Sequence, residues 1–99
     1  MTINGKEIKL HYTMDGLYLW EQTMGRRFEL RTTFDEDVFM YCVIISNNPD
    51  LDITWEEFSH WLEGNKEAKR EFIDFLTRNS VKEDEFVQED GNGEKKSSL

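Results

Sequence analysis

The chain has 99 residues and a formal net charge of −9 at pH 7, with 21 acidic residues against 12 Lys and Arg. This length predicts one domain, and the acidic balance disfavours nucleic acids and anionic membranes as partners, because both attract clustered Lys and Arg. Three Trp, three Tyr and seven Phe can fill a small core. A domain of this size is nevertheless marginally stable, so a homo-oligomer is also expected.

Targeting signals and disulfides are not expected. The N-terminus lacks the basic and apolar regions of a signal peptide. The longest apolar run, Val38 to Ile45, is far shorter than the ~20 residues of a membrane span. The single cysteine, Cys42, lies inside this run and is interpreted as a small buried hydrophobe. We therefore expect a soluble, cytoplasmic protein.

The N-terminus carries the signal of a β-hairpin. Asn4-Gly5 supplies the two positive-φ residues of a type I′ turn. Apolar and polar side chains then alternate from Ile8 to Tyr12, the period of a half-buried strand. Because so few residues precede the turn, this ribbon must lie against helices or pair with another copy.

A first helix is predicted from Met14 to Met24. Thr13 or Asp15 can cap its N-terminus, and Gly25 stands where a left-handed residue ends a helix. Gly16 in the first turn is a weak point, since Gly costs up to about 1 kcal/mol relative to Ala there.

The only basic cluster follows this helix. It consists of Arg26, Arg27 and Arg31. In such acidic surroundings we expect these side chains to face helix carbonyls or to pair with carboxylates, rather than to bind nucleic acid.

The apolar run Val38 to Ile45 predicts a central helix, since a segment that is apolar on all sides must be buried on all sides. Thr33 and Glu36 have the spacing of a capping box, with Thr33 at the N-cap and Glu36 at N3. Pro49 prevents the helix from continuing. The rest of the chain is expected to wrap around this segment.

The segment after the central helix has the outline of a calcium loop. Read as an EF-hand, it places Ser46, Asn48, Asp50 and Glu57 at positions one, three, five and twelve. However, position six is Leu51 where the sharp turn requires Gly. A second capping box, Thr54 to Glu57, explains the same residues as the start of a helix.

Two amphipathic helices are predicted next, from Trp55 to Glu63 and from Lys66 to Asn79. From Ser80 to Leu99 the composition becomes acidic and poor in apolar residues, which indicates a disordered tail. Within this tail, Phe86-Val87 is a candidate anchor for a partner. The domain prediction is thus a single helical domain over 1–79 and an acidic tail over 80–99.

No catalytic pattern is present. The sequence lacks a plausibly spaced Ser–His–Asp set, a Cys–His pair, a phosphate-binding glycine loop and a CxxC motif. We therefore predict a non-enzymatic protein with no cofactor and no metal. One alternative is a small acidic protein-binding adaptor or regulatory module, either calcium-responsive or mimicking nucleic acid.

The order of features resembles the tail assembly chaperones of long-tailed bacteriophages and prophages of Gram-positive hosts. The resemblance covers residues 1–79 and rests on the hairpin ending at Tyr12, a helix with Glu21 that ends at Gly25, the apolar central helix, and Asp52 to Phe58 followed by Trp61-Leu62 and a last amphipathic helix. It implies binding of the tape measure protein, or another helical protein, before the tail tube polymerises in the bacterial host. It often implies self-assembly, and it brings no catalytic residues.

The expected fold is mainly α (α+β), with a short N-terminal hairpin and about four helices packed around the central apolar helix. A binding module of this kind would hold a partner helix in a groove between its own helices. The candidate partner-binding residues are Trp20, Phe28, Phe39, Met40, Trp55 and Trp61. The hairpin and the three other helices each offer only a narrow apolar face, which is less than is needed to cover a central helix that is apolar on all sides. Phe39 and Met40 are therefore predicted to contact another chain.

Overall fold

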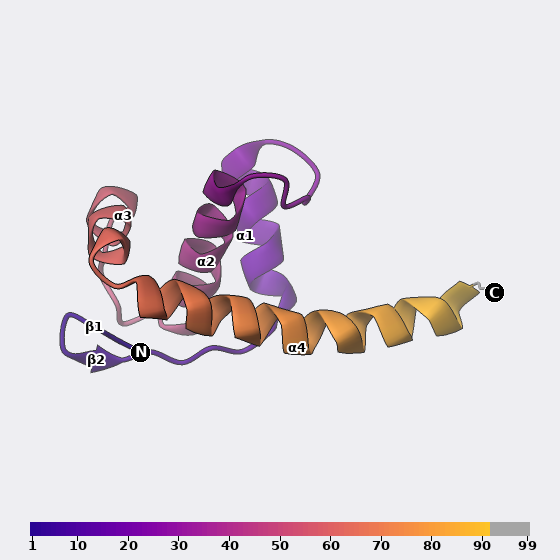
Figure 1. Cartoon of the computed structure of the whole chain (residues 1–99). Helices are drawn as coiled ribbons and strands as arrows, with labels where there is room; N and C mark the ends of the chain where they lie inside the picture. Colours follow the sequence, from indigo (N-terminus) through magenta and orange to yellow (C-terminus); the bar gives the residue numbers. More distant parts are fainter. Residues whose placement is uncertain (92–99) are drawn as a thin grey trace.

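The computed structural model is mainly helical, with a two-stranded hairpin at its N-terminus, which confirms the predicted fold class. It describes residues 1–91, and side-chain environments as far as Asn79. The elements in chain order are β1 Thr2–Ile3, β2 Lys6–Glu7, α1 Met14–Met24, α2 Thr33–Asn47, α3 Trp55–Glu63 and α4 Lys66–Gly91. Figure 1 shows α1 and α2 as a pair, with α3 to one side and α4 running across the end of the pair.

The hairpin turns at Asn4 (φ 53°) and Gly5 (φ 80°), as a type I′ turn requires. The antiparallel pairs are Thr2 with Glu7 and Ile3 with Lys6. The pairing stops there because β1 is only two residues long. The Ile8 N–H still donates to the Met1 carbonyl at 2.9 Å, and the predicted alternation continues to Tyr12 as alternating burial.

The backbone of the extended segment after β2 is hydrogen-bonded by two asparagine side chains at the end of α2. The side chain of Asn48 accepts from the Lys9 N–H and donates to the Lys9 carbonyl, both at 3.0 Å. Asn47 Nδ2 donates to the His11 carbonyl at 2.9 Å. These bonds fasten the extended segment to the central helix and satisfy backbone groups that lack a ladder.

The cap of α2 lies one residue earlier than predicted. Thr32, not Thr33, is the N-cap: its side chain accepts from the Asp35 N–H, and the Asp35 carboxylate accepts from the Thr32 N–H. Asp35, rather than Glu36, is the acidic residue of the capping box. Its buried carboxylate is held there because it also accepts from the Arg31 N–H at 2.9 Å and pairs with Arg26 at 2.8 Å. The prediction of a Thr33–Glu36 box was wrong, and Glu36 instead lies 3.3 Å from Lys69.

Two other predicted helix ends are confirmed, whereas Thr13 at the start of α1 makes no side-chain cap hydrogen bond. Gly25 is left-handed at φ 71°, and its N–H donates to the Glu21 carbonyl. At α3, Thr54 and Glu57 form the reciprocal bonds of the predicted capping box, at 3.1 and 2.9 Å. Local chemistry therefore determines where these two helices end and begin.

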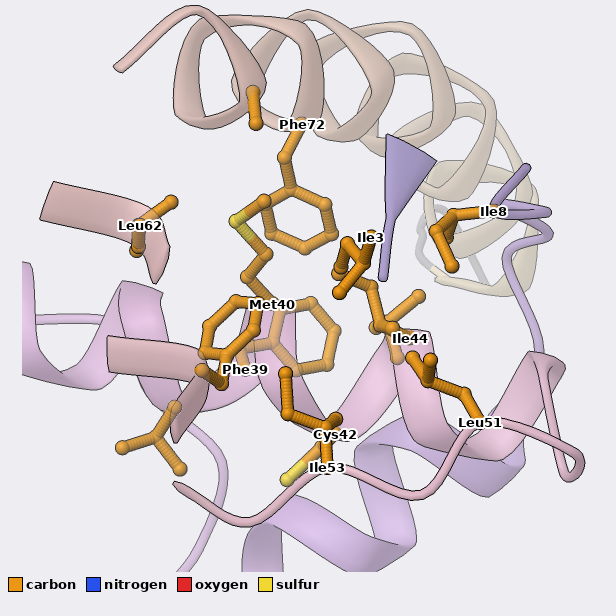
Figure 2. Packing of buried hydrophobic residues seen from close by; sticks show 14 of the residues in the cluster. Ile3, Ile8, Phe39, Met40, Cys42, Ile44, Leu51, Ile53, Leu62 and Phe72 are labelled. Atoms are coloured by element: carbon orange, nitrogen blue, oxygen red, sulfur yellow. The ribbon is translucent and has the colours of Figure 1, made fainter. Parts of the chain in front are cut away.

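The central helix α2 supplies much of the core, and the prediction that Phe39 and Met40 meet another chain is wrong. Phe39 is 1% exposed and Met40 is fully buried. Figure 2 shows both side chains enclosed among Leu62, Phe72 and Ile3. The prediction counted only helical stripes as cover, whereas the hairpin and the loops also contribute apolar side chains to this core.

Gly16 allows α1 and α2 to approach closely, so it is not merely a weak point in α1. It is buried, and a Cβ at this position would lie 3.0 Å from Val43 Cγ2 and 3.2 Å from Val43 Cα. A side chain would therefore meet the backbone of the central helix. The absence of one places the two helices in direct contact.

Helix α4 continues to Gly91, beyond the Asn79 at which the sequence pattern placed its end. Among its residues up to Asn79, where side-chain burial is described, Ala68, Phe72 and Phe75 are buried. In Figure 1 its C-terminal part extends past the other helices. The disordered tail was predicted over residues 80–99: residues 80–91 are helical instead, and residues 92–99 lie outside the described residues, so for them disorder stays a prediction. Over the described residues, no helix is long and apolar enough to cross a membrane.

Candidate partner-binding groove

An apolar groove lies where the end of α1, the first half of α2 and the start of α3 meet. Its volume is about 290 Å³. Its walls are Thr23 and Met24 of α1, Phe34, Val38 and Tyr41 of α2, and Trp55 of α3. The three α2 residues recur at i, i+4 and i+7, so they share one helix face. We call this feature the Phe34 groove.

Phe34 is the most prominent residue of the groove. It is 54% exposed, while its ring meets the Trp55 ring edge-on at a centroid distance of 5.8 Å. The sequence reading missed Phe34 because it treated the residue only as part of a helix cap. Its spacing with Val38 and Tyr41 was the signal that could have revealed it.

Two of the residues that line the groove, Trp55 and Tyr41, are fixed by aromatic contacts. Trp55 meets Tyr41 at 5.6 Å and Phe58 at 6.0 Å between ring centroids, and Phe58 is fully buried. The Tyr41 hydroxyl donates to the Ile53 carbonyl at 2.7 Å. The groove is therefore lined by side chains that other contacts already fix, which reduces the entropy lost when a ligand binds.

A second hollow adjoins the first, because Trp55 lines both. Its volume is about 340 Å³, and its lining comprises Thr33, Asp37, Trp55, Ser59, Leu62, Glu63, Lys66 and Lys69. Lys69 lies 2.7 Å from Asp37 and 3.3 Å from Glu36. Although burial opposes its charged form, the hydrogen bond to Asp37 and the two carboxylate charges raise the pKa of Lys69.

Three of the six predicted partner-binding residues belong to the core. Trp20 and Met40 are fully buried and Phe39 is nearly so. The Trp20 indole N–H donates to the Asp35 carbonyl at 3.1 Å, so its polar atom is satisfied inside the fold. As folded, the chain leaves these three side chains no surface to offer a partner.

The other three candidates are partly exposed, and the structure separates them. Trp55 lines both hollows, whereas Phe28 and Trp61 line neither. Phe28 packs against Trp20 at 5.0 Å between ring centroids, and Trp61 stacks on Phe58 at 5.8 Å. A partner role for Phe28 and Trp61 stays a prediction, and Trp55 is the candidate that the groove supports.

Three exposed carboxylates lie in or just before α3, the helix that contributes Trp55 to the Phe34 groove. Asp52, Glu56 and Glu57 are exposed, and Glu56 follows Trp55 in the chain. Burial raises the pKa of the Tyr41 hydroxyl, and the nearby charges of Glu57 and Asp52 add to that rise. None of the three carboxylates forms an ion pair with a described residue.

In the segment that resembles a calcium-binding loop, the candidate ligand residues make other interactions. Asn48 is bonded to the Lys9 backbone and to the Ile44 carbonyl. Glu57 caps α3, and Ser46 lies within α2. Within the described part of the chain, no three His, Cys, Asp or Glu side chains gather in a way that could hold a metal ion. The loop geometry therefore gives no support to the calcium interpretation.

Cys42 is not placed for thiol chemistry. It is 1% exposed, and burial raises the pKa of its thiol to about 11. A thiol with such a pKa is protonated at neutral pH and is a poor nucleophile.

No family model, no curated protein and no solved structure matches this chain. The function must therefore be argued from the groove itself.

Proposed function

We propose that the protein is a non-enzymatic binding protein that holds an apolar helical segment of a partner in the Phe34 groove. The observation that carries the proposal is the 54% exposure of Phe34 above an apolar hollow. Large aromatic residues that combine exposure with a fixed neighbour, here Trp55, are the usual anchors of protein interfaces. What distinguishes Phe34 from the similarly exposed Met14 and Tyr18 is the apolar hollow that it lines, and an apolar side chain of a partner would cover both.

The shape of the site favours a helix as the ligand. Trp55 lines both hollows, so a ligand that fills both must present apolar side chains at two successive points. An amphipathic helix does this with residues at i, i+3 or i+4, and i+7. An extended strand would instead require an open sheet edge beside the groove, and the two strands that the structure describes lie in the hairpin, which does not line the groove.

The resemblance to tail assembly chaperones supplies a specific partner. Such a protein would bind the tape measure protein in the cytoplasm of the bacterial host and keep this long helical protein soluble until the tail tube forms. The acidic composition of the chain and its small helical fold support this role. In the same proposal, the Phe34 groove is where the tape measure segment binds.

Co-expression with tape measure fragments from the same genome tests the proposal. The wild-type chain should increase the soluble fraction of a fragment and co-purify with it. Phe34→Ala should reduce both effects, because it removes the exposed anchor.

Tyr18→Ala is the matched control. Tyr18 is 52% exposed, which is similar to Phe34, but it does not line the groove. An unchanged soluble fraction with the wild-type chain would contradict the tape measure assignment. Equal losses in the two variants would contradict the placement of the binding site.

A further inference from the structure

Three carboxylates of the α3 segment lie near residues that line the Phe34 groove: the charges of Asp52 and Glu57 act on Tyr41, and Glu56 follows Trp55 in the chain. We call these three residues the α3 margin. Asp52, Glu56 and Glu57 are exposed beside Trp55, and none has a cationic partner among the described residues. The N–H groups at the start of α3 compensate part of this charge, since Glu56 and Glu57 stand in its first turn. That compensation amounts to about half a positive charge, so most of the negative charge of three carboxylates remains.

Two of the described cations near the hollows are already paired with other carboxylates. Lys69 is held by Asp37 and Glu36, and Arg26 is held by Asp35. Lys66, which lines the second hollow but not the Phe34 groove, is the one lining cation without an ion pair among the described residues. A positively charged ligand would therefore meet little competition beside Trp55.

We infer that the Phe34 groove selects a basic amphipathic helix, in which apolar residues fill the two hollows and Lys or Arg residues lie along the α3 margin. This inference rests on the proposed function and adds the charge of the partner to it. Charge complementarity of this kind contributes more to selectivity than to affinity, because the apolar contacts are shared by ligands of either charge. Each exposed ion pair contributes little, but three together amount to about a tenfold difference in Kd.

Two synthetic helical peptides test the inference with the full chain. Both carry the same Leu and Phe residues at i, i+3, i+4 and i+7, and both are acetylated and amidated. The flanking positions are Lys in one peptide and Glu in the other. Fluorescence anisotropy of labelled peptide gives the Kd at low and at high salt. The Lys peptide should bind about tenfold more tightly at low salt, and the difference should shrink at high salt.

Charge-neutralising variants locate the effect. Asp52→Asn combined with Glu56→Gln should remove most of the preference for the Lys peptide. Glu57 is left unchanged because its carboxylate caps α3. The matched control is Asp74→Asn, which neutralises an exposed carboxylate of α4 that lines neither hollow, and it should leave the preference unchanged.

The outcomes separate this inference from the proposed function. Equal binding of the two peptides, or tighter binding of the Glu peptide, would overturn the charge selectivity and leave the groove in place. A preference that persists in the Asp52→Asn, Glu56→Gln variant would also overturn it, because the charge would then act from elsewhere. Failure of both peptides to bind would instead count against the groove as a helix-binding site.

Discussion

Replacing Gly16 by Ala tests the close contact between α1 and α2. The new Cβ would lie 3.0 Å from Val43 Cγ2 and 3.2 Å from Val43 Cα. Two effects oppose each other. Ala is favoured over Gly within a helix by about 1 kcal/mol, whereas overpacking a core costs about 1–3 kcal/mol.

The steric effect should prevail, because a rotation of the Val43 side chain relieves only one of the two contacts. The other contact is with a backbone atom, so α1 and α2 must move apart. We expect a net destabilisation of about 1 kcal/mol, which lowers Tm by about 4–8 °C in a domain of this size.

Thermal and urea unfolding followed by circular dichroism measure this effect. Gln22→Ala, at an exposed position of the same helix, is the control and should change stability little. In the Gly16→Ala background, Val43→Ala should cost less than it does in the wild type, because the two side chains compete for the same space. A Gly16→Ala protein more stable than the wild type would refute the close-contact argument.

Three further predictions concern the core and its buried groups. Phe39→Ala should destabilise the protein by about 3–5 kcal/mol in urea unfolding, because it leaves a cavity beneath the central helix; a loss below 1 kcal/mol would contradict the burial of this ring. The Arg31 N–H bond lowers the pKa of Asp35 against the opposing effect of burial, with Arg26 also favouring the ionised form. The ionised Asp35 carboxylate therefore stabilises the fold fully above its unfolded-state pKa, and this stabilisation is lost as pH falls through the lowered folded-state pKa. The urea concentration at the unfolding midpoint should decrease in acid, and it should decrease less in Asp35→Asn. Cys42 should react with a thiol reagent only after urea unfolding, because its thiol is buried with a pKa of about 11; rapid reaction of the folded protein would contradict this.

The sequence was a good guide wherever local chemistry decides the structure. The Asn4-Gly5 turn, the left-handed Gly25 and the Thr54–Glu57 box each follow from a few neighbouring residues. The α2 cap shows the limit of such reasoning. Two overlapping Thr–x–x–acid pairs fit the sequence, and a distant contact, the ion pair between Arg26 and Asp35, decides between them.

Features that depend on tertiary contacts were harder to predict. Gly16 looks unfavourable in an isolated helix, and its role becomes clear only when Val43 is placed against it. Phe39 and Met40 were assigned to an interface because the cover supplied by the hairpin and the loops was not counted. Phe34, the exposed aromatic residue of the groove, was missed because it was considered only as part of a helix cap.

Chemical-shift mapping tests the central claim most directly. The Lys-flanked helical peptide is titrated into ¹⁵N-labelled full-length protein, and the shifts of backbone amides and Trp indole N–H groups are followed. The groove predicts that the largest shifts cluster at Thr23–Met24, at residues 34–41 and at Trp55, and that Phe34→Ala weakens binding by at least about tenfold. Shifts centred on the hairpin or on α4, with unchanged affinity in Phe34→Ala, would contradict the claim that this groove binds a partner helix.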